Sequence, residues 1–223
     1  MDPKNDFETL FFNPFELSDD LFCDNNDPDE NFFKELQNSY LNTPYLYENE
    51  IEKYLSETTQ MENLSILHLN IRSINANFEK FKLCLEACKF SFNVICLSET
   101  WSSDKDFQNN SLFHIQGYQA IHYKRHVSKR GGGLLIYIKS DLVFKIRHDV
   151  NISDSNREFL SIEIVLKETK NFIITCSYKP PTGSMCEFYE HIEKIFNKAQ
   201  SENKGLFILG DFNLNCLNYA QNS

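Results

Sequence analysis

From Leu64 onward, the chain alternates short apolar runs with two amphipathic helical stretches. The runs have the length of strands, whereas Phe78, Phe81 and Leu85 recur at helical spacing. Strands interleaved with helices predict an α/β fold in which sheets of mixed direction lie inside and helices cover them. We expect strands at 65–69, 93–97, 118–123, 133–138, 142–147, 158–166, 171–178 and 205–209, and helices at 75–89 and around 188–199.

Two of these strands have patterns that predict how they are buried. Residues 93–97 are continuously apolar, which is typical of a strand covered on both faces. Between Leu160 and Leu166, apolar residues alternate with residues that include Ser161 and Glu163. This alternation predicts a strand with one face in the core.

Residues 1–62 differ from the rest of the chain in charge. They hold 16 acidic and 3 basic residues, a balance of -13, whereas residues 63–223 hold 16 acidic and 19 basic residues, a balance of +3. A segment without a helical or strand period buries too little surface to offset its ordering entropy. We expect an acidic, largely disordered extension over 1–62, with a short helix near 48–57, and one domain over 63–223. The alternative for the extension is an acidic-hydrophobic segment that folds on a protein partner.

Neither a membrane span nor a signal peptide is indicated by the sequence, because no apolar run reaches about 18 residues and the N-terminus is acidic. We therefore predict an intracellular protein, nuclear or cytoplasmic. The seven cysteines fit no zinc motif. Cys96 and Cys176 lie in apolar runs and are expected to be buried, reduced thiols. Cys84 and Cys88 lie one helical turn apart, but no second ligand pair accompanies them.

Polar side chains directly follow four of the apolar runs. Asn70, Glu99 and Tyr178 each close one run, and Asp211 with Asn213 follows the last. Taken singly, each has an ordinary explanation, because Asn and Asp cap turns, Glu99 can be a surface carboxylate and Tyr178 a core aromatic. Ligands gather at the carboxyl ends of strands in open α/β sheets. Four strands that end in this way predict a shared site.

Five motifs occur in order along the domain. They are L-N-I-R-S-I at 69–74, L-S-E-T-W at 97–101, G-G-G-L-L-I-Y at 131–137, S-Y-K-P-P at 177–181 and L-G-D-F-N at 209–213. Together they resemble the endonuclease/exonuclease/phosphatase superfamily, and within it the apurinic-type endonuclease domain of non-LTR (LINE-like) retrotransposons. The resemblance covers roughly residues 63–215. It implies a four-layer α/β sandwich, with two mixed β-sheets flanked by helices, and divalent-metal-dependent nicking of DNA phosphodiester bonds.

The resemblance also implies a role for each strand-end residue. Glu99 would ligate Mg²⁺ or Mn²⁺, and Asn70 would support the metal or the attacking water. Tyr178 would hydrogen-bond the phosphate, Asp211 would orient and deprotonate the water, and Asn213 would stabilise charge on the phosphorane. The residue types suit this chemistry, because Mg²⁺ takes carboxylate oxygen and keeps several waters, while neutral donors stabilise developing charge.

Basic residues before the glycine run are candidates for contacts to DNA phosphates, which would give weak and mainly sequence-independent affinity. The candidate DNA-binding residues are Arg72, Lys124, Arg125, Lys129 and Arg130. The alternative for residues 122–130 is a solvated hairpin.

Two glycine positions have different expected roles. The run Gly131–Gly133 is followed by a strand and by no Lys-Ser/Thr pair, so we expect a tight turn and close packing there rather than a phosphate loop. Gly210 precedes Asp211, where it would allow a sharp turn or close approach to a ligand.

The resemblance implies a further acidic residue and a Ser-Asp-His motif beyond Asn213, but none of the six histidines follows Asp211. Loss of such a general catalyst commonly costs about 100- to 10,000-fold in rate. We therefore expect a C-terminally truncated domain with an incomplete catalytic set, the N-terminal piece of a retroelement protein whose reverse transcriptase would lie downstream. Three functions stay open: this endonuclease, a non-catalytic nucleic-acid- or protein-binding remnant, and another phosphoesterase of the same superfamily.

Overall fold

The structure, a computed structural model, describes residues 53–55, 64–102, 112–123, 131–167 and 169–213. Leu64–Asn213 form one compact unit. The elements of this unit are β1 (Ile66–Asn70), α3 (Ile74–Cys88), β2 (Val94–Ser98), β3 (Tyr118–Tyr123), β4 (Leu134–Lys139), β5 (Phe144–Ile146), β6 (Ile152–Ser153), β7 (Glu158–Ile164), β8 (Phe172–Tyr178), α5 (Met185–Ser201) and β9 (Gly205–Asp211).

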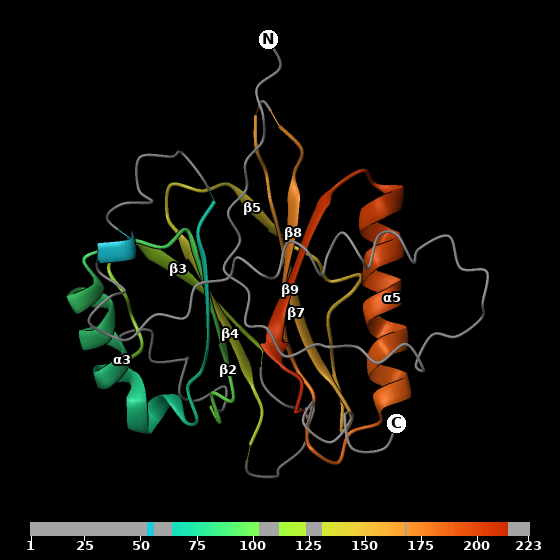
Figure 1. Cartoon of the computed structure of the whole chain (residues 1–223), viewed down its shortest axis with the longest axis horizontal. Helices are drawn as coiled ribbons and strands as arrows, with labels where there is room; N and C mark the ends of the chain where they lie inside the picture. Colours follow the sequence, from blue (N-terminus) through green and yellow to red (C-terminus); the bar gives the residue numbers. More distant parts are fainter. Residues whose placement is uncertain (1–52, 56–63, 103–111, 124–130, 168, 214–223) are drawn as a thin grey trace. The chain divides into compact units, whose positions relative to one another are not determined.

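Two sheets of mixed direction form the centre of this unit (Figure 1). The first sheet has the order β1-β2-β4-β3, with β1 parallel to β2 and the other pairs antiparallel. The second has the order β5-β7-β8-β9, with β6 also paired to β7, and only β8 and β9 are parallel to each other. The α/β architecture with two mixed sheets is confirmed.

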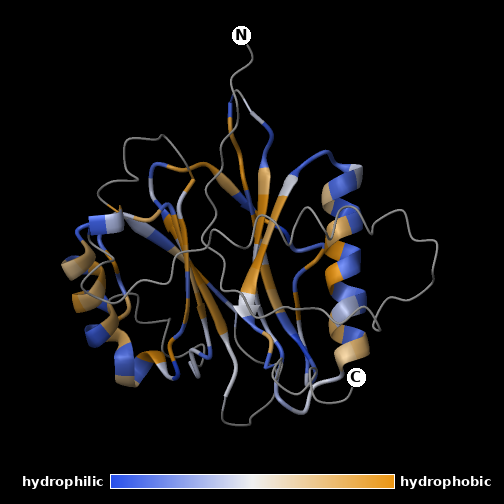
Figure 2. Cartoon of the chain, in the orientation of Figure 1, coloured by the Kyte–Doolittle hydropathy of each residue, from blue (hydrophilic) through white to orange (hydrophobic). Residues whose placement is uncertain are grey.

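The main apolar core lies between the two sheets, where strand segments are strongly hydrophobic (Figure 2). Alternate residues of β2 and β4 meet alternate residues of β7 and β8 there, as the period of two along a strand requires. This core contains Val94, Cys96, Leu134, Ile136, Ile138, Leu160, Ile162, Ile164, Ile174, Cys176 and Tyr178. Cys96 and Cys176 are buried, free thiols, as expected.

A helix covers the outer face of each sheet, which gives the four layers. On one side α3 buries Ile74, Phe78 and Phe81. On the other side α5 packs Phe188 and Ile195 against the second sheet. The α5 helix begins at an N-cap, Ser184, whose side chain accepts a hydrogen bond from the Glu187 N–H, and such caps commonly stabilise a helix by about 1 kcal/mol.

The structure differs from the expected strands in two places. Every residue of β7 is buried, so the expectation of one core face was wrong for this strand. Its second face is covered because Phe159 packs on Phe188 of α5 and Ser161 bonds to Thr175 on β8. In addition, the expected strand at 142–147 is paired only over β5, and β6 was not expected.

A cluster of paired charges lies at one end of the second sheet, around Arg147 and Glu163. The Arg147 guanidinium, 7% exposed, contacts Asp149, Glu163 and Glu202, and Lys204 also bonds to Glu163 and Glu202. Pairing with Arg147 holds the pKa of Asp149 at about 2, and pairing with Lys204 and Arg147 holds that of Glu202 at about 2. Since Arg147 and Glu163 are buried and paired, removing one of these partners would leave an uncompensated charge and destabilise the fold.

The acidic extension lies almost wholly outside the described residues. Within it, residues 53–55 are helical, which confirms that part of the short helix expected near 48–57. The expected protein partner of this extension and the intracellular location stay predictions. No helix among the described residues is long and apolar enough to cross a membrane.

Candidate active site at the strand ends

Polar side chains replace apolar ones at one end of the space between the sheets. The first sheet supplies Asn70 and Ser98, which are partners in the β1–β2 register. The second supplies Glu158, Tyr178 and Asp211, which are neighbours across β7, β8 and β9. The strand period places these five residues on the inner faces, in line with the core residues beneath them.

The Asn70 side chain connects the two sheets at this end. Its Nδ2 donates to Glu99 Oε1 at 2.8 Å and to Asp211 Oδ2 at 2.6 Å. Asn70 and Asp211 are 141 positions apart in the chain, so only the packing of one sheet on the other brings them together. The amide oxygen, Oδ1, accepts a bond from the Arg72 N–H at 3.1 Å. The structure thus brings together three of the predicted site residues.

Left-handed backbone conformations are concentrated in the loops that follow these strands. Glu99 has φ 53° and Trp101 has φ 52°, while Arg72, Ser73 and Asn213 also have positive φ. Such conformations cost about 1–3 kcal/mol each and persist where surrounding contacts hold them, commonly at functional sites. Here the Ser73 N–H donates to the Glu99 carbonyl at 2.9 Å, and the Trp101 indole N–H donates to Glu99 Oε2 at 3.1 Å. Glu99 is therefore held through its backbone and through both carboxylate oxygens.

Asp211 and Asn213 are fixed to the end of β8. Asp211 Oδ1 accepts from the Asn213 N–H at 3.1 Å, and Asn213 Nδ2 donates to the Lys179 carbonyl at 2.8 Å. Tyr178 is 4% exposed and belongs to the core between the sheets, as expected if it is a core aromatic. It also lies at the end of β8, where a residue that bonds to a phosphate was expected. Burial lowers the pKa of the neighbouring Lys179, which Asp211 partly opposes.

The glycine expectations had different outcomes. Gly131, Gly132 and Gly133 all have positive φ and form a turn packed against Thr100, as expected. Gly210 instead lies within β9, where a Cβ would meet the Ser177 carbonyl oxygen at 2.0 Å. The expected sharp turn at Gly210 was therefore wrong, whereas the expected close approach to a ligand stays a prediction. Glycine is needed there because the backbone of β8 is so close.

Only one of the five predicted DNA-binding residues, Arg72, is among the residues that the structure describes. Arg72 is exposed and lies two positions after the site residue Asn70. The other four, Lys124, Arg125, Lys129 and Arg130, lie outside the described residues. Their role stays a prediction.

Two polar residues at this end, one buried and one half-buried, were not recognised from the sequence. Glu158, 1% exposed, accepts a bond from the Gly133 N–H at 2.7 Å. His68 lies one inward-facing position below Asn70, and its Nε2 is 3.2 Å from the buried Ser98 hydroxyl. Burial lowers the pKa of His68 to about 4, although the charge of Asp211 opposes this shift. A titratable residue in a mainly apolar strand was the available signal for both.

The wild type is expected to lose stability as the pH falls from 6.5 to 4, and the His68→Gln variant is not. In that interval the unfolded chain binds a proton at this residue that the folded chain excludes, so falling pH favours unfolding. The size of the shift corresponds to a fall on the order of 3 kcal/mol in the free energy of unfolding of the wild type.

Urea unfolding of the wild type and His68→Gln at several pH values measures this difference. The pKa values of Asp149 and Glu202 are held at about 2, so protonation of these carboxylates lowers the stability of the protein only at lower pH. Their contribution is the same in both proteins. Parallel stability profiles for the two proteins would contradict the buried, neutral His68.

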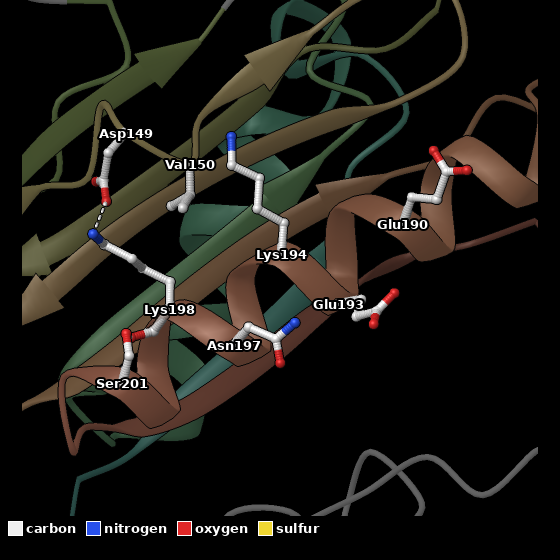
Figure 3. Close-up of a pocket in the computed structure, with 8 residues that line it drawn as sticks. All are labelled: Asp149, Val150, Glu190, Glu193, Lys194, Asn197, Lys198 and Ser201. Carbon is white, nitrogen blue, oxygen red and sulfur yellow. Dashed lines mark hydrogen bonds and ion pairs between the residues drawn. The ribbon is translucent and has the colours of Figure 1, made fainter.

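A separate, open groove of about 580 Å³ lies along α5, away from the strand ends (Figure 3). Lys198 and Asp149, 3.9 Å apart, face each other across one part of it. The groove is lined by Asp149, Val150, Glu190, Glu193, Lys194, Asn197, Lys198 and Ser201. None of the predicted site residues lines it.

Comparison with known proteins supports this arrangement of strands. The endonuclease/exonuclease/phosphatase family model matches residues 67–219. The fold is similar to the endonuclease domain of TRAS1, a telomere-specific non-LTR retrotransposon, with 14% identity and a TM-score of 0.50 over 67% of this chain and 60% of that one. It is also similar to the AP endonuclease LMAP from Leishmania major, with 14% identity and a TM-score of 0.51 over 75% of this chain and 63% of that one.

The chain thus matches about three fifths of the length of these two solved structures. At such low identity the likeness shows the fold. A search of curated proteins found no match.

Proposed function

The chain belongs to the endonuclease/exonuclease/phosphatase family, and on this premise we propose that its strand-end site is a divalent-metal-dependent endonuclease site that nicks DNA. The observation that carries the proposal is the pair of carboxylates, Glu99 from one sheet and Asp211 from the other, that share the Asn70 amide. Phosphodiester hydrolysis needs two such groups with separate tasks, one for a cation and one for the attacking water.

The donor set at this end suits a hard cation. Glu99 offers carboxylate oxygen, and Asn70 would offer its amide oxygen once the amide turns from its bond to the Arg72 N–H toward Glu99. Mg²⁺ uses one or two such protein ligands and keeps several waters. Among the residues that the structure describes, no three His, Cys, Asp or Glu side chains gather as a metal cluster, so a bound ion would rely largely on water and substrate oxygens. When bound by Glu99 and Asn70, Mg²⁺ or Mn²⁺ would polarise the phosphate.

The proposal also gives tasks to Asp211, Asn213 and Tyr178, which their positions support. Asp211 is half-buried, and its Oδ2 is directed to the same amide nitrogen as Glu99, so it is placed to accept a proton from a water between the sheets. Asn213 would exchange its bond to the Lys179 carbonyl for one to a phosphate oxygen as charge develops there. The Tyr178 hydroxyl would be a further donor to the phosphate.

The substrate class rests on two kinds of support. Two similar folds are named as an AP endonuclease and as a retrotransposon endonuclease domain, and both descriptions refer to DNA-processing or mobile-element proteins. In addition, residues 63–223 carry a balance of +3 while the chain as a whole carries -10, so the domain alone does not repel a polyanion. We therefore propose DNA, bound weakly and mainly through its phosphates, and an origin in a retrotransposon.

Chelation is expected to abolish the activity. We expect the protein to convert supercoiled plasmid to the open-circular form in Mg²⁺, to stop in excess EDTA, and to recover when Mg²⁺ is restored in excess. Gel electrophoresis of time courses measures the rate. Nicking that is unchanged by EDTA would exclude the metal-dependent mechanism, and plasmid binding without nicking would favour a non-catalytic nucleic-acid-binding domain.

A further inference from the structure

We propose that Glu158 is a positioning residue of the site, which holds Glu99 in place through the glycine turn Gly131–Gly133. This inference rests on the proposed function, because it assigns Glu158 a task in presenting the Glu99 carboxylate to a cation.

Glu158 links the second sheet to the first. It is the first residue of β7, is 1% exposed, and its Oε2 accepts from the Gly133 N–H at 2.7 Å. Gly133 directly precedes β4, which belongs to the other sheet. A charge-assisted hydrogen bond in a buried environment is among the stronger polar contacts in a fold. This hydrogen bond therefore holds the glycine turn of the first sheet against the start of β7 in the second sheet.

The glycine turn in turn fixes the segment that bears Glu99. The Thr100 N–H donates to the Gly133 carbonyl at 3.1 Å, and the Trp101 N–H donates to the Gly132 carbonyl at 2.9 Å. Packing is equally close, since a Cβ on Gly133 would lie 2.5 Å from Thr100 Oγ1. Movement of the turn would therefore be passed directly to residues 100 and 101.

Glu99 depends on this support because its own backbone is strained. Glu99 and Trp101 both have left-handed φ, and the Trp101 indole holds one Glu99 carboxylate oxygen. Strained conformations of this kind persist only when surrounding contacts determine them. Without the Glu158 acceptor, residues 99–101 could relax, and a shift of about 1 Å in a catalytic group can reduce a rate about 100-fold.

Two substitutions at position 158 separate this task from general stabilisation. Glu158→Gln removes the charge but keeps an oxygen that can accept from Gly133, whereas Glu158→Asp keeps the charge but withdraws the oxygen by one carbon–carbon bond. Glu163→Asp is the matched control, because Glu163 is also on β7 and 3% exposed but bonds to the ionic cluster at the other end.

Trp101 provides the readout, since it is the only tryptophan in the chain and bonds to Glu99. We expect Glu158→Asp to increase acrylamide quenching of Trp101 fluorescence in metal-free protein and to weaken Mn²⁺ binding, measured by calorimetry, by about tenfold, the lower end of what lost outer-shell contacts cost. Glu158→Gln keeps an acceptor oxygen but loses the charge, so it should lie between the wild type and Glu158→Asp in both measurements. Glu163→Asp should lower the melting temperature and change neither.

The proposal is overturned if Glu158→Asp leaves quenching unchanged, if Glu158→Gln is the more affected variant, or if Glu163→Asp reproduces the effect. Should Glu158→Asp fail to fold, Glu158→Gln still decides, because quenching equal to that of the wild type in this variant would contradict a charge-assisted acceptor role. A wild type that neither binds Mn²⁺ nor nicks DNA would sink the proposed function, whereas the quenching experiment would still test Glu158.

Discussion

Glu99→Gln is expected to reduce Mg²⁺-dependent nicking by at least about 100-fold, since even the loss of contacts outside a metal's ligands costs about 10- to 100-fold. Gln has the size of Glu but lacks the charge that a hard cation requires. Asn70 and Trp101 both donate hydrogen bonds to the Glu99 side chain, and the single amide oxygen of Gln can keep only one of the two. The loss should therefore come from weaker cation binding, with the fold maintained.

Plasmid nicking and Mn²⁺ calorimetry, performed on the same preparations, measure this effect. Glu86→Gln is the control, because Glu86 is an exposed residue of α3 and the substitution has the same chemistry. Both variants should have the circular dichroism spectrum of the wild type. Equal nicking by Glu99→Gln and the wild type would end the assignment of Glu99 as a metal ligand.

Most of the fold could be predicted from the sequence because periodicity records which faces are buried. The apolar run at 93–97 became β2, buried on both faces, and the helical spacing from Phe78 became α3. Where prediction was wrong, the cause was tertiary. Ser161 and Glu163 look like solvent-facing residues of β7, but a hydroxyl partner on β8 and the ionic cluster satisfy them in the interior.

The sequence predicted which residues belong to the site better than it predicted the hydrogen bonds between them. A polar residue after each apolar strand indicates Asn70, Glu99 and Asp211, since strand ends of packed sheets can converge. That one Asn70 amide would bridge two carboxylates is a consequence of how the sheets stack, which no local pattern encodes. Glu158 and His68 escaped recognition for a similar reason, because each occurs at or within a strand and its partner belongs to another element.

Asp211→Asn is expected to lower nicking by about 100- to 10,000-fold, the usual contribution of a general acid or base. An amide keeps the shape of the carboxylate and can still accept the bond from the Asn213 N–H, but it loses the acceptor for the Asn70 Nδ2 and cannot take a proton from water. Cation binding should change little, because Glu99 and Asn70 carry it in the proposed site. Asp211→Asn would thus separate the two carboxylates by task.

The decisive comparison places Glu99→Gln and Asp211→Asn side by side in nicking and Mn²⁺ calorimetry. Asp141→Asn, at an acidic residue whose side chain is 68% exposed, controls for the substitution itself. If Asp211 is the base, its variant binds Mn²⁺ like the wild type and yet fails to nick, whereas the Glu99 variant loses both. Equal loss of Mn²⁺ binding in the two variants would instead mean that both carboxylates hold the cation. The base would then have to be another residue near the Asn70 amide.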